Sequence, residues 1–374
     1  QVILKDTSDE SLKKGVAHIK SQVEKLKYLS EQEKSFIVNR IEATTKESLN
    51  MSSALIAIEA AFEDLSVKRN IFQDLARVMP AEAILASNTS SIKISEIAAN
   101  IPHPERVVGM HFFNPVEKMP LVEIVRGSQT SDKAVVMVAA LATKLGKYPI
   151  VVNDVPGFLV NRILTPYLAE AAWLLSEGYS IQDIDNAAVA FGMPMGPLRL
   201  LDEVGLDIAA HVCEIMLTGY GDRMKGPGFE QKLVTANRKG RKNGGGFYDF
   251  KEDGSITPAD IRSILGIEKP LITNPDLKII EERLLLAMIN EAIKCLDEGV
   301  AGKPGAEAVN QIDLGSVMGF GFPPFKGGVL FYAQSVGAKK IFESLTRLMK
   351  EVGERFRPSQ GIEVRARTNR SFLS

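Results

Sequence analysis

Apolar and polar positions alternate along the first part of the chain in a pattern that predicts strands and helices in turn. Short apolar runs, which are typical of buried strands, occupy residues 1–6, 54–58, 83–86, 106–111, 121–125 and 149–152. Between these runs, helical spacing of apolar residues predicts helices at 8–29, 30–45, 65–78, 92–99 and 131–145. Strands that alternate with helices favour a mostly parallel sheet with helices on both faces.

The pattern changes after residue 153, where strand-like runs give way to long amphipathic helices. Pro156 and Gly157 mark this boundary, because proline disfavours helix before it and glycine loosens the residues after it. A polar stretch with three consecutive glycines, within 243–271, marks a second boundary. We therefore expect an α/β unit at 1–153 and helical units at 154–255 and 256–374.

The two helical units repeat one sequence pattern. Asn161-Arg162, Glu170-Ala171 and Glu177-Gly178 match Glu282-Arg283, Glu291-Ala292 and Glu298-Gly299 at a constant offset without gaps. Each unit then carries an Ile-Asp pair, at 184–185 and 312–313, and a Val-Gly pair, at 204–205 and 336–337. Coincidence between two amphipathic helices is the alternative, but the gap-free match favours a duplicated helical unit.

Composition narrows the class of protein. The chain has 374 residues, of which 45% are hydrophobic and 24% charged, as in ordinary globular proteins, and its net charge of −1 gives no sign of a nucleic-acid surface. No apolar run approaches the roughly 18 residues of a membrane span, and no metal site is expected. The scarcity of cysteine fits buried thiols better than a disulfide between Cys213 and Cys295. The chain begins without Met, so we expect its true start to lie elsewhere.

Asp6 ends the first predicted strand. In a dinucleotide-binding fold, an acidic residue in such a position binds the ribose of NAD and repels the extra phosphate of NADP. A strand-end Asp is more often a helix cap, although Thr7 or Ser8 could cap the next helix equally well. A G-x-G-x-x-G loop should precede such a strand by some 20 residues, yet the only glycine before Gly109 is Gly15, inside a predicted helix.

Polar side chains also stand where other elements begin or end. Residues 87–91, Ser-Asn-Thr-Ser-Ser, come directly after a predicted strand and could face a ligand crevice. They could also cap the helix at 92–99, and at least one serine is expected to do so. Asn161 opens the first long helix after the boundary, where its amide could bind a substrate oxygen or cap the helix.

His111 stands at the end of a predicted strand, directly before Phe-Phe-Asn-Pro. A histidine in this place suits a general base at the crevice. The other three histidines fall in predicted helices or in a loop between prolines. Glu123 lies on the next predicted strand, and a carboxylate bonded to one imidazole nitrogen fixes the tautomer and raises the basicity of the other. A surface glutamate on an edge strand is the alternative interpretation.

Six motifs in order resemble 3-hydroxyacyl-CoA dehydrogenases. Within residues 1 to about 250 they are Ser-Asn-Thr-Ser-Ser, His-Phe-Phe-Asn-Pro, Leu-Val-Glu-Ile, Pro-Gly-Phe-Leu-Val-Asn-Arg, Met-Gly-Pro-Leu-Arg-Leu-Leu-Asp-Glu-Val-Gly-Leu-Asp and Gly-Gly-Gly-Phe-Tyr. The second helical unit, with Pro-Pro-Phe-Lys-Gly-Gly at 323–328, resembles multifunctional fatty-acid β-oxidation enzymes, in which an enoyl-CoA hydratase part precedes the dehydrogenase. The resemblance implies a Rossmann-like NAD-binding domain without its first strand and glycine loop, followed by a duplicated all-α domain.

The resemblance also implies an activity, the NAD-dependent oxidation of 3-hydroxyacyl-CoA to 3-ketoacyl-CoA, and a role for each matching residue. His111 would remove the hydroxyl proton, Glu123 would orient His111, and Ser90 and Asn161 would hold the substrate oxygen. Tyr332, in the second helical unit, would be a further substrate contact. The expected cofactor contacts are Asp6 at the adenosine ribose, with Glu63, Lys68, Ser90, Asn114 and, more distantly, Lys242.

The resemblance further implies partners and leaves alternatives. A thiolase subunit and the hydratase part would be partners, in the cytoplasm of a bacterium or in the mitochondria or peroxisomes of a eukaryote. The second helical copy would pack on the first and replace the partner subunit of a single-copy enzyme, because its apolar helix face needs burial. An alternative interpretation is that the chain is a non-catalytic acyl-CoA-binding or structural remnant, and the missing glycine loop favours this alternative. A different hydroxyacid dehydrogenase with the same plan is opposed by the His-Phe-Phe-Asn-Pro motif.

The expected loss of the first strand has a structural consequence. In the strand order 3-2-1-4-5-6 the first strand lies between the strands at 1–6 and 54–58. Each buried, unpaired backbone group costs about 1–3 kcal/mol, so several would rival the roughly 5–15 kcal/mol stability of a domain. Either the segment exists outside these 374 residues, or strand 1–6 pairs directly with strand 54–58, or another segment fills the space. In the last two cases we expect no ordered NAD and no dehydrogenase activity from this polypeptide alone.

Overall fold

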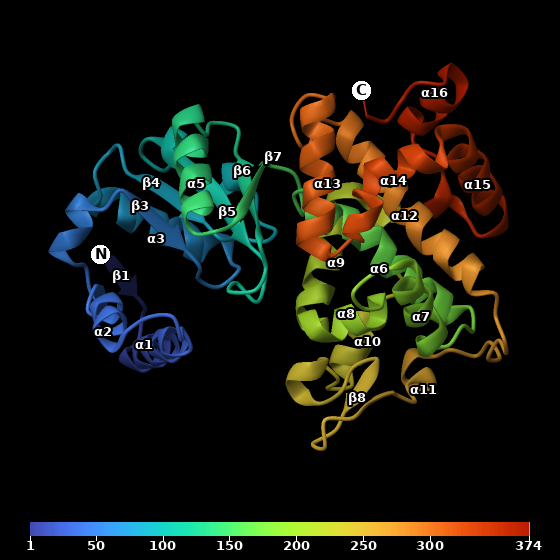
Figure 1. Cartoon of the computed structure of the whole chain (residues 1–374), viewed down its shortest axis with the longest axis horizontal. Helices are drawn as coiled ribbons and strands as arrows, with labels where there is room; N and C mark the ends of the chain where they lie inside the picture. The colour runs from blue at the N-terminus through green and yellow to red at the C-terminus, as the bar shows by residue number, and fades with distance from the viewer. Residues whose placement is uncertain (374) are drawn as a thin grey trace.

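The main sheet of the computed structural model, which describes residues 1–373, has five strands in the order β3-β4-β5-β6-β7 (Figure 1). The strands are β3 (Ile56–Glu59), β4 (Ile84–Ser87), β5 (Val107–Phe112), β6 (Leu121–Arg126) and β7 (Tyr148–Asn153). Neighbours run parallel except β5 and β6, which are antiparallel. The connection from β5 to β6 is a short loop, and a parallel pair would need a longer crossover. The predicted mostly parallel sheet is confirmed.

Helices α3 (Leu65–Val78), α4 (Ile94–Ala98) and α5 (Asp132–Lys144) connect these strands. All eight of these elements begin and end within two residues of their predicted limits. Alternate side chains of β4, β5 and β6 form two cores. One packs against α5, and the other is continuous with the core of the helical half. The sheet and the helical half therefore share one packed interior.

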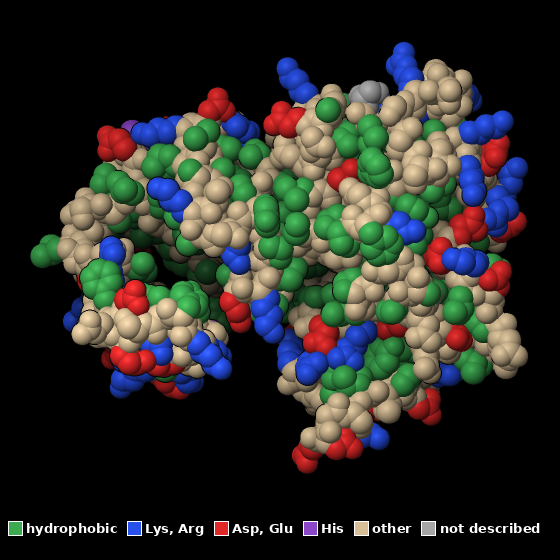
Figure 2. Space-filling model, viewed as in Figure 1, with side chains coloured by type: hydrophobic (Ala, Val, Ile, Leu, Met, Phe, Trp, Pro, Cys, Tyr) green, Lys and Arg blue, Asp and Glu red, His purple; other side chains and the backbone are tan. Residues whose placement is uncertain are grey.

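The N-terminal residues form a separate unit. β1 (Val2–Lys5) pairs in parallel with β2 (Ile41–Thr44), and α1 (Asp9–Glu24) and α2 (Glu31–Val38) connect them. Residues 41–45 were expected to continue a helix. That expectation was wrong, because α2 ends at Val38 and residues 41–44 pair with the backbone of β1. Direct pairing of the strand at 1–6 with the strand at 54–58 is also contradicted, since β1 pairs with β2 and β3 pairs with β4. Figure 2 shows a hollow between this unit and the rest of the molecule.

The helical half contains the same four helices twice. The first set is α6 (Val160–Ser176), α7 (Ile181–Phe191), α8 (Pro197–Val204) and α9 (Leu206–Tyr220). The second set is α12 (Leu277–Asp297), α13 (Ala306–Phe320), α14 (Val329–Val336) and α15 (Ala338–Glu351), after which comes α16 (Gln360–Thr368). Between the sets lie α10 (Phe229–Thr235), the hairpin of β8 (Tyr248–Phe250) and β9 (Ile256–Pro258), and α11 (Arg262–Leu265).

Equivalent aspartates fix the same helix start in each set. Asp185 accepts hydrogen bonds from the backbone N–H groups of the second and third residues of α8, at 2.9 and 3.0 Å. Asp313 accepts from the corresponding groups of α14, at 2.7 and 3.2 Å. A carboxylate at a helix N-terminus satisfies free N–H groups and interacts favourably with the helix dipole. The duplication predicted from the sequence is therefore present in the tertiary structure.

The two copies pack through α6 and α12, and reciprocal ion pairs join these helices. Arg162 of α6 binds Glu291 of α12 at 2.9 Å, and Arg283 of α12 binds Glu170 of α6 at 2.7 Å. All four side chains are buried. The expectation that the second copy packs on the first is confirmed.

Two kinds of feature are absent from residues 1–373. No helix in that range is long and apolar enough to cross a membrane. The same residues contain no group of three or more His, Cys, Asp or Glu side chains placed to bind a metal ion.

Cys213 and Cys295 both have free thiols. Burial raises the pKa of the Cys213 thiol to about 12, so this thiol is protonated at neutral pH.

Candidate active site

His111 and Glu123 lie directly opposite each other on β5 and β6. The antiparallel register pairs the two residues, and His111 Nδ1 lies 2.8 Å from Glu123 Oε2. The His111 side chain is 7% exposed and that of Glu123 is fully buried, which excludes the surface-glutamate interpretation. Because Glu123 occupies Nδ1, the other ring nitrogen, Nε2, is the one left to exchange a proton with a ligand.

The second oxygen of Glu123 is held by the start of α6. Glu123 Oε1 accepts hydrogen bonds from the backbone N–H groups of Leu159, at 3.1 Å, and Val160, at 2.9 Å. These are free donors at a helix N-terminus, where the dipole favours a negative charge. The buried carboxylate thus has three partners, which fix its plane and the orientation of the His111 ring.

The loop before α6 makes this arrangement sterically feasible. Gly157 has a φ of 69°, and a Cβ there would lie 2.5 Å from Met216 Sδ, so any other residue at this position would be strained. Phe158 comes next with a φ of 51°, and its buried ring centroid lies 5.7 Å from that of His111. The ring of Phe113 lies on His111 at 4.6 Å. Two aromatic rings therefore limit the movement of the imidazole.

Asn161 and Ser90 are connected to this pair. Asn161 comes directly after Val160 on α6, and its Nδ2 lies 3.4 Å from the carbonyl oxygen of Ser90, a long hydrogen bond. The backbone N–H of Ser90 donates to Glu63 at 3.0 Å. The structure thus brings His111, Glu123, Asn161 and Ser90 together through one series of contacts, although they come from four separate segments.

Glu63 anchors the 87–91 loop. It also accepts hydrogen bonds from Thr89 Oγ1 at 2.6 Å and from the N–H and hydroxyl of Ser91 at 3.0 and 2.9 Å. Burial by itself would raise the pKa of Glu63, but the bond from Thr89 and the charge of Lys68 outweigh burial, and the net pKa is lowered. Glu63 is therefore ionised at neutral pH and holds the loop.

Lys68 is buried, with 1% of its side chain exposed, between Glu59 at 2.8 Å and Glu63 at 3.3 Å. Glu59 also accepts a hydrogen bond from Ser87 Oγ at 2.6 Å. Glu59 was not predicted from the sequence as a site residue, whereas Ser87 opens the 87–91 stretch that was expected to face a ligand crevice. Each is the last residue of a strand, the position where crevice residues collect. Lys68 thus ties together the carboxyl ends of β3 and β4.

No serine caps α4, and the expectation that one would do so was wrong. The free N–H groups of Ile94 and Ser95 instead donate to the two carboxylate oxygens of Asp154, each at 2.8 Å. Asp154 lies just before α6, at the boundary predicted from Pro156 and Gly157. This contact joins residues far apart in the sequence, so no local pattern could have revealed it.

The remaining predicted site residues lie at different places. Asp6 is exposed after β1 and accepts from the N–H of Thr7 at 2.6 Å, while Ser8 is the N-cap of α1. Asn114 is exposed in the loop after β5. Lys242 forms an ion pair with Asp207 in the first helical copy. Tyr332, on α14, packs edge-on against Phe191 with ring centroids 5.2 Å apart.

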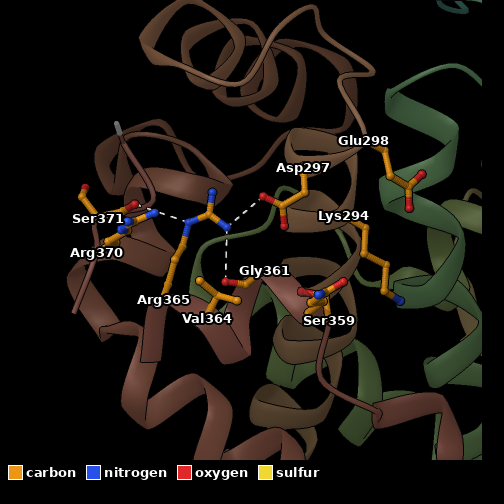
Figure 3. Close-up of a pocket in the computed structure, with 10 residues that line it drawn as sticks. Lys294, Asp297, Glu298, Ser359, Gly361, Val364, Arg365, Arg370 and Ser371 are labelled. Atoms are coloured by element: carbon orange, nitrogen blue, oxygen red, sulfur yellow. Dashed lines mark hydrogen bonds and ion pairs between the residues drawn. The ribbon is translucent and has the colours of Figure 1, made fainter. Parts of the chain in front are cut away.

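A cavity of about 520 Å³ lies in the second helical copy between α12 and α16 (Figure 3). Its charged lining is mostly paired: Arg365 binds Asp297 at 2.8 Å and Lys294 binds Glu291 at 3.2 Å. None of the predicted site residues lines this cavity, so it gives no support to a second active site.

A Rossmann-like sheet with a histidine–carboxylate pair at the start of a helical domain is the arrangement expected of an NAD-dependent dehydrogenase. Residues 1–155 match the NAD-binding domain of 3-hydroxyacyl-CoA dehydrogenase, and residues 157–250 match the C-terminal domain of the same family. The chain belongs to the 3-hydroxyacyl-CoA dehydrogenase family, and its cofactor class is NAD.

Individual relatives agree with this family. The chain is 44% identical, over 88% of its length, to a fatty acid oxidation complex subunit alpha from Shewanella putrefaciens, and covers 46% of that protein. It therefore spans about half the length of the curated relatives it matches. A 3-hydroxybutyryl-CoA dehydrogenase structure from Escherichia coli K12 superposes with a TM-score of 0.83 at 28% identity, covering 98% of this chain and 93% of that one. The structure of (S)-3-hydroxybutyryl-CoA dehydrogenase PaaH1 from Ralstonia eutropha superposes with a TM-score of 0.64 at 40% identity. The match covers 67% of this chain and 91% of that one.

Proposed function

We propose that this chain carries the site for NAD-dependent oxidation of 3-hydroxyacyl-CoA to 3-ketoacyl-CoA in fatty-acid β-oxidation. The observation that supports this most directly is the His111–Glu123 pair, with Nδ1 held at 2.8 Å and both side chains buried. A fixed, oriented imidazole at the carboxyl end of a strand is what abstraction of a hydroxyl proton needs.

In this proposal each residue has a distinct task. His111 Nε2 takes the proton of the 3-hydroxyl group, and the Glu123 carboxylate stabilises the resulting imidazolium through Nδ1. Ser90 and the amide of Asn161 lie beside the pair and orient the substrate oxygen. NAD, when bound, supplies the acceptor for the hydride that leaves C3 of the substrate.

The residues present fit this cofactor in part. The carboxylate of Asp6 is exposed after β1, where it suits a ribose hydroxyl. Ser90 and Asn114 come after strands at the carboxyl edge of the main sheet. Lys68 is buried and Lys242 is paired with Asp207, so we assign them to support of the crevice and of the first helical copy.

We also propose the wider context from the relatives. Proteins named fatty acid oxidation complex subunit alpha are parts of a multi-enzyme assembly, so a thiolase subunit and an enoyl-CoA hydratase part are the partners we expect. Tyr332 remains a proposed substrate contact of the second copy. We further propose the divisions 1–153, 154–255 and 256–374 as domains, since the duplicated helices fall on either side of the last boundary, which passes through the β8–β9 hairpin.

The test replaces each member of the pair and measures turnover with NAD and 3-hydroxybutyryl-CoA, together with NADH binding by calorimetry. His111→Gln should lower kcat by about 10²–10⁴-fold. Glu123→Gln should also slow turnover, and the two losses should be less than additive because the residues act as a unit. His211→Gln, at an exposed position on α9, is the control and should leave kcat unchanged.

Near-normal turnover in both pair variants would refute the assignment. If the unchanged chain binds 3-hydroxyacyl-CoA but neither binds NADH nor turns over, the remnant function is supported instead.

A further inference from the structure

The second helical copy contacts the main sheet through one face of α13. Gln311, Gly315 and Gly319 lie four residues apart on this helix and therefore share a face. Gln311 Oε1 accepts a hydrogen bond from the backbone N–H of Val151 at 2.6 Å, on the edge strand β7. Helix α13 stands next to β7 in Figure 1.

The two glycines allow this helix to approach the sheet closely. A Cβ at Gly315 would lie 3.1 Å from Ile150 Cδ1 and 3.3 Å from Leu159 Cδ2. At Gly319 it would lie 2.9 Å from both Leu121 Cδ2 and Val160 Cγ2. All four neighbours are buried, and valine has little rotamer freedom within a helix. Any side chain at position 319 must therefore displace Val160, Leu121 or α13 itself.

These four neighbours lie close to Glu123 in the structure or in the sequence. The backbone N–H groups of Leu159 and Val160 donate to Glu123 Oε1. Leu121 stands two residues before Glu123 on β6, so both side chains point to the same face of the sheet. The glycine face of α13 thus packs against the groups that hold the carboxylate.

The first helical copy does not have this face. Helix α7 corresponds to α13, because Asp185 and Asp313 cap equivalent helices. The positions that correspond to Gly315 and Gly319 are Ala187 and Phe191, and Phe191 packs against Tyr332. The glycines therefore occur only in the copy whose helix lies on the sheet, so internal packing of the repeat does not explain them.

We propose that Gly315 and Gly319 of the second helical copy are positioning residues for the His111–Glu123 pair. By seating α13 against Leu121, Leu159 and Val160, they fix the N-terminus of α6 and with it the plane of the Glu123 carboxylate. The kinetic part of this inference rests on the proposed function, whereas the structural part does not.

The test is Gly319→Ala in the full chain, with two independent measurements. The first is the downfield proton resonance of the His111 Nδ1–H···Glu123 hydrogen bond, assigned by its loss in His111→Gln. We expect it to shift upfield or weaken. The second is turnover. We expect kcat to fall about 10- to 100-fold, because a displacement of about 1 Å can cost up to about 100-fold, and KM for NAD to stay within about twofold of the parent. Adding Val160→Ala removes both Val160 Cγ atoms but leaves the contact with Leu121 Cδ2 at 2.9 Å, so the resonance and kcat should recover in part.

Two further variants keep the inference open to refutation. Gly15→Ala makes the same replacement in α1, where the nearest atom would be at 3.4 Å, and should change neither measurement. Gln311→Ala removes the bond to Val151 without adding an atom, and should shift the resonance in the same direction even if Gly319→Ala fails to fold. An unchanged resonance in both Gly319→Ala and Gln311→Ala, or no recovery on adding Val160→Ala, overturns the proposal. A chain without dehydrogenase activity would refute the proposed function, while the resonance still decides this inference.

Discussion

The reciprocal ion pairs between the helical copies allow a quantitative test of how the second copy is held. Replacing Arg283 by Met removes one of the two arginine partners of Glu170, whose side chain is 1% exposed. Arg283 also binds Glu177, at 2.6 Å. Loss of one member of a buried pair costs about 3–5 kcal/mol. Arg355 remains on Glu170 at 2.6 Å, so we expect the lower end of this range, about 3 kcal/mol.

The assay is thermal unfolding of the parent and variant at pH 7.5 and pH 5. For a unit of about 150–250 residues, 1 kcal/mol shifts Tm by about 2–4 °C, so Arg283→Met should lower Tm by about 6–12 °C. Burial already raises the pKa of Glu170, against the lowering effect of Arg283. Without Arg283 the pKa of Glu170 in the folded state rises further above its value in the unfolded state. The destabilisation by Arg283→Met therefore grows as pH rises through the folded-state pKa, and the drop in Tm should be smaller at pH 5 than at pH 7.5.

Two comparisons isolate the buried pair. Arg347→Met removes a half-exposed arginine that binds Glu282 and Glu351, and such surface pairs contribute about 0–1 kcal/mol. The double variant Arg283→Met, Glu170→Met should recover most of the stability, because no uncompensated charge remains buried. A Tm for Arg283→Met within about 2 °C of that for Arg347→Met would show that the pair does not hold the copies together and refute the reasoning.

Three other predictions concern the cofactor, the second copy and the buried aspartates. The Asp6 carboxylate should repel the 2′-phosphate of NADP, so turnover with NAD should greatly exceed turnover with NADP, and Asp6→Asn should reduce this difference. Equal rates with both cofactors in the parent chain would contradict this role. Deleting 272–374 exposes the buried face of α6, so light scattering should detect dimers or aggregates, and a soluble monomer would argue against the second copy as a substitute for a partner subunit. Burial raises the pKa values of Asp185 and Asp313 to about 6, above the roughly 3.9 of an unfolded aspartate. The folded state then binds more protons than the unfolded state, so these groups contribute stability that is present below about pH 4 and is lost as pH rises to about 6. Asp313→Asn should therefore flatten the dependence of the urea midpoint on pH between these values. An unchanged slope would count against the raised pKa of Asp313.

Much of the site could be predicted from local patterns. The hydrophobic periodicity predicted β5 and β6, and these two strands were enough to place Glu123 beside His111. The strand ends and the helix start located Ser90 and Asn161. These placements agree with the structure because each depends on burial along one short element, which the alternation of apolar and polar side chains records directly. The roles of the four residues stay a prediction. The same reasoning failed for 41–45, because a four-residue strand has too weak a pattern to compete with a neighbouring helix.

The sequence by itself determined the order of strands and helices in the main sheet, the duplication of the helical unit and the candidate base with its carboxylate. Only the tertiary structure showed that Asp154 caps α4, that Lys68 is buried between two glutamates, and that Gly315 and Gly319 lie on the sheet behind Glu123. The physical reason is that capping, ion pairing and close packing join residues distant in the chain. Their energies depend on distances between elements, and no periodicity along a single element encodes those distances.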